Sequence, residues 1–88
     1  MEIEYTTQAL EDIEFWKRSG NTNLRRKISI LIAEIEISPF AGTGRPEMLK
    51  HQFSGYWSRR INNQHRIIYK VFDQRIVVAS LKGHYTNE

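Results

Sequence analysis

Two side chains in the second half of the chain could together cleave a phosphodiester by acid–base chemistry. Glu47 lies in a loop rich in glycine and proline, between Arg45 and Lys50, and His84 lies close to the C-terminus. RNA cleavage needs a base for the ribose 2′-hydroxyl proton, cations for the charge on the phosphate, and an acid for the departing 5′-oxygen. Glu47 is therefore a candidate base. His84 is a candidate acid, because an imidazole exchanges protons near neutral pH.

The cations for such a site are expected on two consecutive strands. Arg60 lies on the first of them and Arg66 on the second. Arginine can bind a phosphate with two parallel hydrogen bonds, which suits this task. Whether the two arginines share one face of the sheet depends on the register through Asn62-Asn63, which the sequence leaves open. Tyr85 could stack on a base or orient the ribose.

The remaining histidines give weaker indications. His51 and His65 have no zinc-protease spacing with each other or with His84, so no metal site and no cofactor are predicted. His51 follows Lys50 and is a candidate RNA contact. His65 stands beside a turn and is expected at the surface.

Charge is divided unevenly along the chain. Residues 1–44 carry five Lys and Arg against seven Asp and Glu, a balance of −2, whereas residues 45–88 carry eight against three, a balance of +5. A basic half of a small protein suggests a polyanionic partner, although a solvated charge excess without a partner is the plain alternative. The 88 residues suffice for one domain, 1–88.

Several classes of protein are disfavoured by composition. With no cysteine, the chain has no disulfide framework and no thiolate metal site, which favours the cytoplasm. The acidic start lacks the order of a signal peptide. The apolar stretches are too short to span a membrane, so no membrane partner is expected.

The first half of the chain predicts a short strand followed by two helices. The boundary signals are Ile3-Glu4-Tyr5 for the strand, Thr6 or Thr7 and Gly20 for the first helix, and Asn21-Thr22-Asn23 and Ser38-Pro39 for the second. Helical spacing predicts two apolar stripes that face a shared core. The stripe residues are Leu10, Ile13 and Trp16 or Lys17 in the first helix, and Leu24, Ile28, Leu31, Ile32 and Ile35 in the second.

The second half predicts strands. Residues 40–55 form a loop with one helical turn after Pro46, and strands follow over residues 56–61, 65–72 and 75–82. Asp73-Gln74 suits a tight hairpin between the last two. The fold class is therefore α+β, with the order β-α-α-β-β-β. We expect an antiparallel sheet covered on one face by the helix hairpin, which leaves the other face available.

Four separated blocks of the sequence carry a family resemblance. The blocks are Pro39-Phe40-x-Gly42-x-Gly44-x-Pro46-Glu47-x-Leu49-Lys50-His51, Ser54-Gly55-Tyr56-Trp57-Ser58-Arg59-Arg60-Ile61, His65-Arg66-x-x-Tyr69 and His84-Tyr85. In order and spacing they resemble the Txe/YoeB family of bacterial toxins, within the RelE-like superfamily. The resemblance implies a RelE-like fold of the microbial-ribonuclease type. It also implies a ribosome-dependent endoribonuclease that cuts mRNA at the decoding site without a metal, leaving a cyclic phosphate.

The resemblance assigns roles to the candidate residues. It makes Glu47 the general base and His84 the general acid, with Arg66 stabilising the transition-state phosphate and Tyr85 positioning the substrate. Further basic positions associated with RNA binding correspond to Lys50 and Arg60. The implied partners are mRNA on the ribosome, ribosomal RNA and a cognate antitoxin whose disordered segment folds over the toxin. A homodimer is also implied.

Two other functions compete with this one. A toxin that acts on DNA gyrase could use a similar scaffold, but it would not need Glu47, Arg66 and His84 together. A binding module without catalytic activity could use the same basic face to dock on nucleic acid or on an antitoxin.

Overall fold

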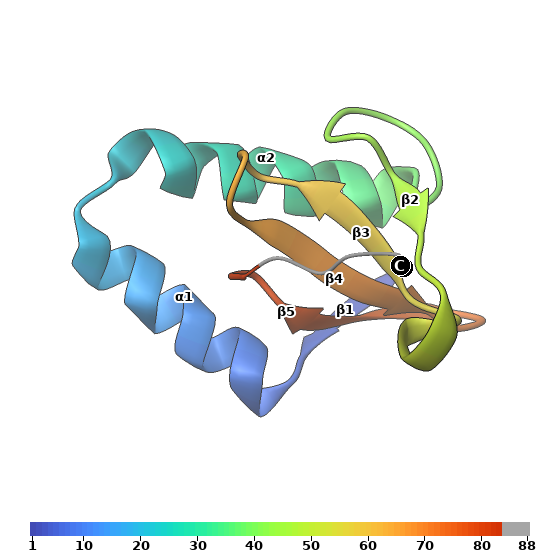
Figure 1. The fold of residues 1–88 in the computed structure, drawn as a ribbon. Coiled ribbons are helices and arrows are strands. Elements are labelled where there is room, and N and C mark those ends of the chain that lie inside the picture. The colour runs from blue at the N-terminus through green and yellow to red at the C-terminus, as the bar shows by residue number, and fades with distance from the viewer. Residues whose placement is uncertain (84–88) are drawn as a thin grey trace.

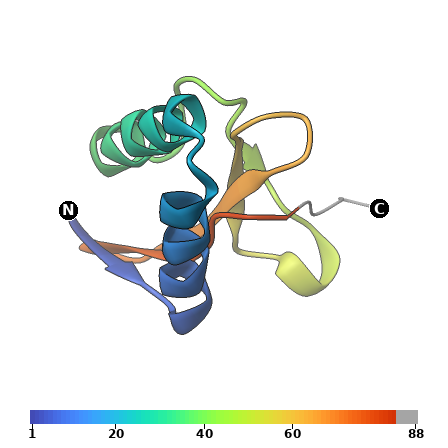
Figure 2. The ribbon, with the colours of Figure 1, turned by 90° about the vertical axis from the view of Figure 1, so that its left-hand side faces the viewer.

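A five-stranded sheet with both helices on one side forms the fold of residues 1–83, the part of the chain that this computed structural model describes (Figures 1 and 2). The elements are β1 (Glu2–Tyr5), α1 (Thr7–Ser19), α2 (Thr22–Ile37), β2 (Glu47–Met48), the 3₁₀ turn η1 (His51–Phe53), β3 (Trp57–Arg60), β4 (Arg66–Val71) and β5 (Arg75–Ser80). The predicted α+β class and helix hairpin are confirmed. No helix within these residues is long and apolar enough to cross a membrane.

The sheet is mixed, with the strand order β1-β5-β4-β3-β2. β1 runs parallel to β5, with Ile3 opposite Ile76, and the other neighbouring strands are antiparallel. Only this β1–β5 pair differs from the antiparallel expectation. A parallel pair needs a long connection, which residues 6–74 supply, whereas short turns such as those between β3, β4 and β5 join antiparallel strands.

β2 is a strand that the sequence prediction missed, because residues 40–55 were expected to be a loop. Its two residues pair with β3, with Glu47 opposite Ser58 and Met48 opposite Trp57. The helical turn expected after Pro46 lies further along, at η1. Two residues are too few for an alternating pattern to reveal a strand.

The predicted stripe of α1 is confirmed only in part, because Trp16 is buried and Ile13 packs against the core, whereas Leu10 does not. Thr6 caps the helix by accepting a hydrogen bond from the Ala9 N–H at 3.1 Å. The buried residues of the helix are Ala9, Asp12 and Trp16, whereas Leu10 is 52% exposed. The stripe therefore runs through a carboxylate, which an apolar pattern cannot show.

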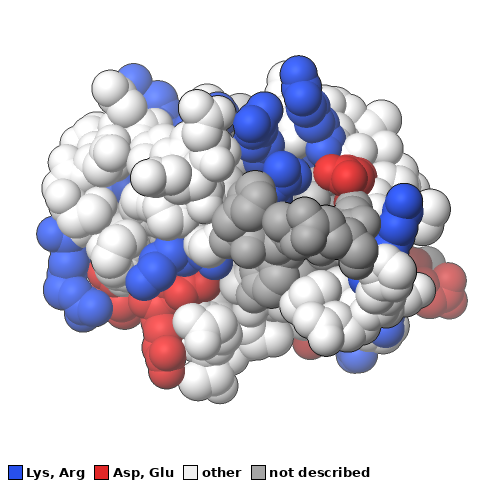
Figure 3. Space-filling view, viewed as in Figure 1, with Lys and Arg blue, Asp and Glu red and all other residues white. Residues whose placement is uncertain are grey.

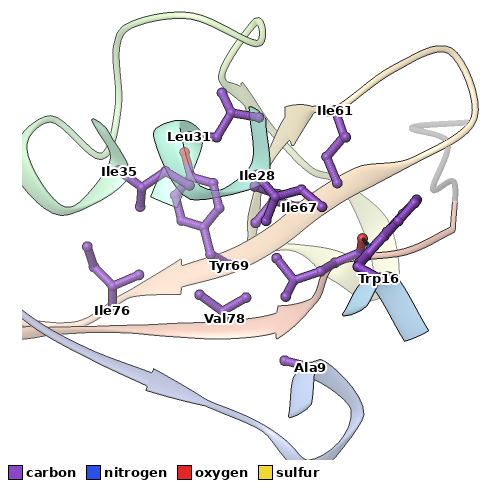
Figure 4. Close-up of a cluster of buried hydrophobic side chains, with 11 residues drawn as sticks. Ala9, Trp16, Ile28, Leu31, Ile35, Ile61, Ile67, Tyr69, Ile76 and Val78 are labelled. Atoms are coloured by element: carbon purple, nitrogen blue, oxygen red, sulfur yellow. Dashed lines mark hydrogen bonds between the residues drawn. The ribbon is translucent and has the colours of Figure 1, made fainter. Parts of the chain in front are cut away.

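The apolar stripe of α2 packs as its spacing predicts. Ile28, Leu31 and Ile35 are buried, and they face Ile67 and Tyr69 of β4 (Figure 4). Residues at these three- and four-residue intervals share one side of a helix. This side covers the middle of the sheet and leaves the opposite side of the strands without a helix.

A fully buried arginine joins the segment after α2 to the sheet. Arg59 of β3 is 0% exposed and points to the core side, opposite Ile67. Its guanidinium donates hydrogen bonds to the carbonyl oxygens of Ser38, Ala41 and Thr43, to Glu34 Oε1 at 3.2 Å and to Tyr69 Oη at 3.3 Å. One side chain thus fixes both the end of α2 and the segment that follows it.

This anchored segment leads directly into β2. The Gly44 carbonyl accepts a hydrogen bond from the Arg60 N–H at 2.6 Å. Gly42 has a φ of 125°, and a Cβ there would lie 2.7 Å from Glu34 Oε1 and 3.0 Å from Arg59 Nη1. Only glycine fits such a conformation beside these atoms. The position of Glu47 therefore depends on contacts made around Arg59.

We predict that Arg59→Met lowers the free energy of unfolding by about 3 kcal/mol, because removing a buried charged partner leaves its acceptors without a donor. Urea denaturation measures this. The matched control is Arg18→Met, at an exposed arginine in the last turn of α1, which should change the free energy by less than about 0.5 kcal/mol. Equal losses for the two variants would contradict the anchoring role.

The carboxylate of Glu34 gives this region a pH dependence. The Thr43 hydroxyl and the Thr43 N–H donate to it at 2.7 and 3.0 Å, and with the charge of Arg59 they hold its pKa below the ordinary value of 4.5. A carboxyl with a lowered folded-state pKa stabilises the fold above its unfolded pKa, and this contribution is lost as the pH falls through the folded pKa.

We therefore predict that Glu34→Gln lowers the free energy of unfolding at neutral pH, and that its difference from the wild type shrinks as the pH falls from 4.5 through the folded pKa. Urea denaturation over a pH series measures this. Glu11→Gln, at an exposed residue of α1, is the control for a change of net charge. A difference that stayed constant across the series would refute the prediction.

Candidate active site

The side of the sheet without helices carries the predicted site residues of the strands. Directly opposite residues of antiparallel strands share a face. Glu47 is paired with Ser58, and Arg60 is paired with Arg66. The question that the sequence left open is thus answered, because both arginines lie on the face that also carries Glu47.

The turn between β3 and β4 sets this register. The Asn62 side-chain oxygen accepts hydrogen bonds from the N–H groups of Gln64 and His65 at 2.9 and 2.8 Å. The Ile61 N–H donates to the His65 carbonyl at 2.9 Å. Such an asparagine turn closes the chain through a side chain, so the register does not follow from strand patterns alone.

Glu47 and Arg66 form an ion pair on this face. Glu47 Oε2 lies 3.6 Å from Arg66 Nη1, and the glutamate side chain is 50% exposed whereas that of the arginine is 17% exposed. Lys and Arg side chains gather around an acidic group over β2 and β3 (Figure 3). A carboxylate that can accept a proton thus lies beside a guanidinium that can hold an anion.

Four buried polar atoms around this pair have no hydrogen-bond partner among residues 1–83. They are Nε of Arg60, Nε of Arg66, Oγ of Ser58 and Oγ of Ser80. Ser58, Ile68 and Ser80 lie opposite one another across β3, β4 and β5, so the two hydroxyls share the face of the arginines. Buried polar groups are nearly always paired, and this grouping is what a polar ligand would complete.

The other candidate residues lie at η1 or outside the described residues. Lys50 and His51 are exposed at the start of η1, in the connection from β2 to β3, and His51 has a left-handed φ of 58°. His84 and Tyr85 lie outside the described residues. Within residues 1–83, no three His, Asp or Glu side chains come close enough to hold a metal ion.

His65 differs from its predicted surface position. Its ring is partly buried and meets the Trp16 ring edge-on, with the centroids 5.0 Å apart. Its Nδ1 accepts a hydrogen bond from the Gly83 N–H at 3.0 Å, and the Arg66 N–H donates to the Gly83 carbonyl at 3.0 Å. The last described residue is therefore attached directly to the strand that carries the site arginine.

A hollow of about 320 Å³ opens between α1 and α2, with Trp16, Ile28 and Ile32 in its lining. None of the predicted site residues lines it. The candidate site is thus a charged face of the sheet. Such a face suits an extended polyanion better than a small molecule, which usually binds in an apolar pocket.

Comparisons with known proteins point to one family. Residues 5–85 match the family described as YoeB-like toxin of bacterial type II toxin–antitoxin system. The toxin YoeB of Streptomyces coelicolor is 42% identical over 85 residues, which is 97% of this chain and 100% of the relative. The solved YoeB/ParE toxin from Agrobacterium tumefaciens superimposes with a TM-score of 0.91 at 41% identity, covering 97% of this chain and 100% of that one.

Two solved structures from Staphylococcus aureus show related assemblies. A heterotetrameric YoeB–YefM toxin–antitoxin complex contains a chain that matches with a TM-score of 0.84 at 38% identity. A YoeB dimer matches with a TM-score of 0.86 at 38% identity. Each match covers 97% of this chain and 98% of the other.

We predict that inorganic phosphate raises the melting temperature of the wild type, because a ligand that binds only the folded state stabilises it. Arg66→Met should lose most of this shift, since the substitution removes the guanidinium beside Glu47. Arg75→Met, at an exposed arginine of β5, is the matched control and should keep it. Scanning calorimetry measures the shifts, with chloride at equal ionic strength as the reference. Equal phosphate shifts in the two variants would contradict an anion site at Arg66.

Proposed function

The chain belongs to the YoeB-like toxin family of bacterial type II toxin–antitoxin systems, and on this premise we propose that it is an endoribonuclease that cuts mRNA on the ribosome. Cleavage takes place at the decoding site and stops translation in the cytoplasm. The partners are mRNA, ribosomal RNA and a cognate antitoxin, as YefM is for the Staphylococcus aureus relative. A second copy of the chain is a further partner, by analogy with the dimer of that relative.

The observation that carries this proposal is the ion pair of Glu47 and Arg66, 3.6 Å apart, with Arg60 opposite Arg66. This face thus carries a carboxylate that can act as the base and two guanidiniums that can hold the phosphate, which are two of the three kinds of group that the reaction needs. The Nε atoms of both arginines have no hydrogen-bond partner among the described residues, so the fold does not use up all the donors of these guanidiniums.

The reaction needs no group from outside the chain and the RNA. Glu47 takes the proton from a ribose 2′-hydroxyl, whose oxygen forms a bond to the adjacent phosphorus. Arg66 and Arg60 hold the negative charge that builds up on the phosphate oxygens. The bond from phosphorus to the 5′-oxygen breaks, and His84 gives that oxygen a proton. The products are a 2′,3′-cyclic phosphate and a free 5′-hydroxyl.

The exposed setting of the site supports dependence on the ribosome. Half of the Glu47 side chain is open to solvent, and the site lies on the face of the sheet that neither α1 nor α2 covers (Figure 1). Such an exposed site holds an isolated RNA strand loosely. In reactions of this kind, the correct orientation of the reacting groups contributes much of the rate. The ribosome supplies this orientation by presenting the message, and Tyr85, Lys50 and His51 add contacts to the RNA.

We predict that His84→Ala and Glu47→Gln each lower cleavage of ribosome-bound mRNA by about 100-fold or more, the usual contribution of a general acid or base. Both variants should still sediment with ribosomes, because the basic residues remain. The measurement is the mapping of cleavage sites in a purified translation system, with Glu11→Gln as the control and the same message without ribosomes as a slower substrate.

The outcome of this experiment separates the proposed enzyme from its alternatives. If the wild type does not cleave mRNA, and His84→Ala still arrests growth and binds ribosomes, the protein is a binding module. Inhibition of gyrase supercoiling by the wild type, again without cleavage, would identify a gyrase-directed toxin. Either result would overturn the proposed function.

A further inference from the structure

The chain that follows β5 is held by side chains of α1. The Leu81 N–H donates to Asp12 Oδ2 at 2.9 Å, and the Leu81 carbonyl accepts from Trp16 Nε1 at 2.8 Å. Asp12 and Trp16 stand one turn apart on the helix and are only 3% and 6% exposed. Both backbone groups of one residue are thus fixed at the point where the ladder of β5 ends.

Gly83 is held in the same manner by two consecutive residues. The Gly83 N–H donates to His65 Nδ1 at 3.0 Å, and the Gly83 carbonyl accepts from the Arg66 N–H at 3.0 Å. Its φ of 96° lies in the region that favours glycine. The carbonyl group belongs to the planar peptide unit that joins Gly83 to His84. These two hydrogen bonds therefore fix the covalent starting point of the proposed acid.

His65 is itself held rigidly. Its N–H donates to Asn62 Oδ1 at 2.8 Å, and its carbonyl accepts from the N–H groups of Ile61 and Asn62 at 2.9 and 3.3 Å. The ring is packed edge-on against Trp16. To accept a hydrogen bond at Nδ1, the imidazole must carry its proton on Nε2.

We propose that His65 is a positioning residue of the cleavage reaction, acting on His84 through the hydrogen bond from Gly83. This inference rests on the proposed function. The guanidinium of Arg66 lies beside the proposed base, and the N–H of the same residue holds the peptide unit before the proposed acid. His65 completes this second attachment, so the residue from which the acid extends is hydrogen-bonded to two consecutive residues at the start of β4.

A matched pair of substitutions separates the hydrogen bond from simple packing. Asparagine places an acceptor oxygen where His65 has Nδ1, and leucine has nearly the same shape but no acceptor. His65→Leu should lower kcat on ribosome-bound mRNA by about 100-fold, the cost of misplacing a reacting group by about 1 Å. KM should stay within about twofold, because the basic residues are unchanged. His65→Asn should keep kcat within about fivefold of the wild type.

Amide exchange gives a measurement that does not depend on catalysis. In His65→Leu, the Gly83 N–H should exchange with solvent faster than in the wild type, and in His65→Asn it should stay protected. NMR on the folded protein measures this. Equal kcat values for the two variants, or equal exchange of Gly83, would overturn the proposal.

A double-mutant cycle tests whether His65 acts through His84. If it does, His65→Leu should lower kcat no further in a His84→Ala background, since the group that it positions is already absent. If the double variant instead shows a loss of kcat equal to the product of the two single losses, the proposal is overturned. Failure of the proposed function is seen separately, because the wild type itself would then cleave no ribosome-bound mRNA.

Discussion

The arrangement of the candidate site depends on one buried positive charge. A guanidinium taken out of water must replace its hydration with hydrogen bonds, and all acceptors of Arg59 except the Tyr69 hydroxyl come from α2 and the segment that follows it. This requirement draws the segment over the core side of β3 and places Gly44 against Arg60. β2 can then form opposite β3, which brings Glu47 onto the open face. A buried arginine of this kind specifies a conformation more than it adds stability.

Arg59 and Arg60, which are neighbours on β3, have different roles. Successive residues of a strand point to opposite faces, so the first of these arginines enters the core and the second meets Arg66 on the open face. The first has all of its partners within the fold. The second keeps a buried Nε with no partner among residues 1–83. The protein thus pairs its inner arginine completely and leaves hydrogen-bonding capacity on the face where the phosphate is proposed to bind.

Patterns that repeat along the chain were predictable, and contacts made by single side chains were not. The stripe of α2 and the hairpin at Asp73-Gln74 follow from spacing and turn residues, and the structure confirms both. The buried face of α1 was predicted only at Ile13 and Trp16, because Asp12 interrupts its apolar stripe. A signal was nonetheless present, since this carboxylate falls at helical spacing between Ala9 and Trp16. The pairing of the site arginines could not be predicted, because an asparagine side chain sets the turn.

Side chains also hold the backbone at three places near the candidate site where strands begin or end. Arg59 holds the segment that enters β2, Asn62 closes the turn between β3 and β4, and Asp12 with Trp16 holds the residue after β5. In each case a side chain pairs with backbone groups that lie outside the strands, as buried backbone groups require. These supports come from distant parts of the sequence and converge on three neighbouring strands. A face made of strand ends can therefore be as well defined as a pocket, because its edges are fixed by side chains and its middle by the sheet.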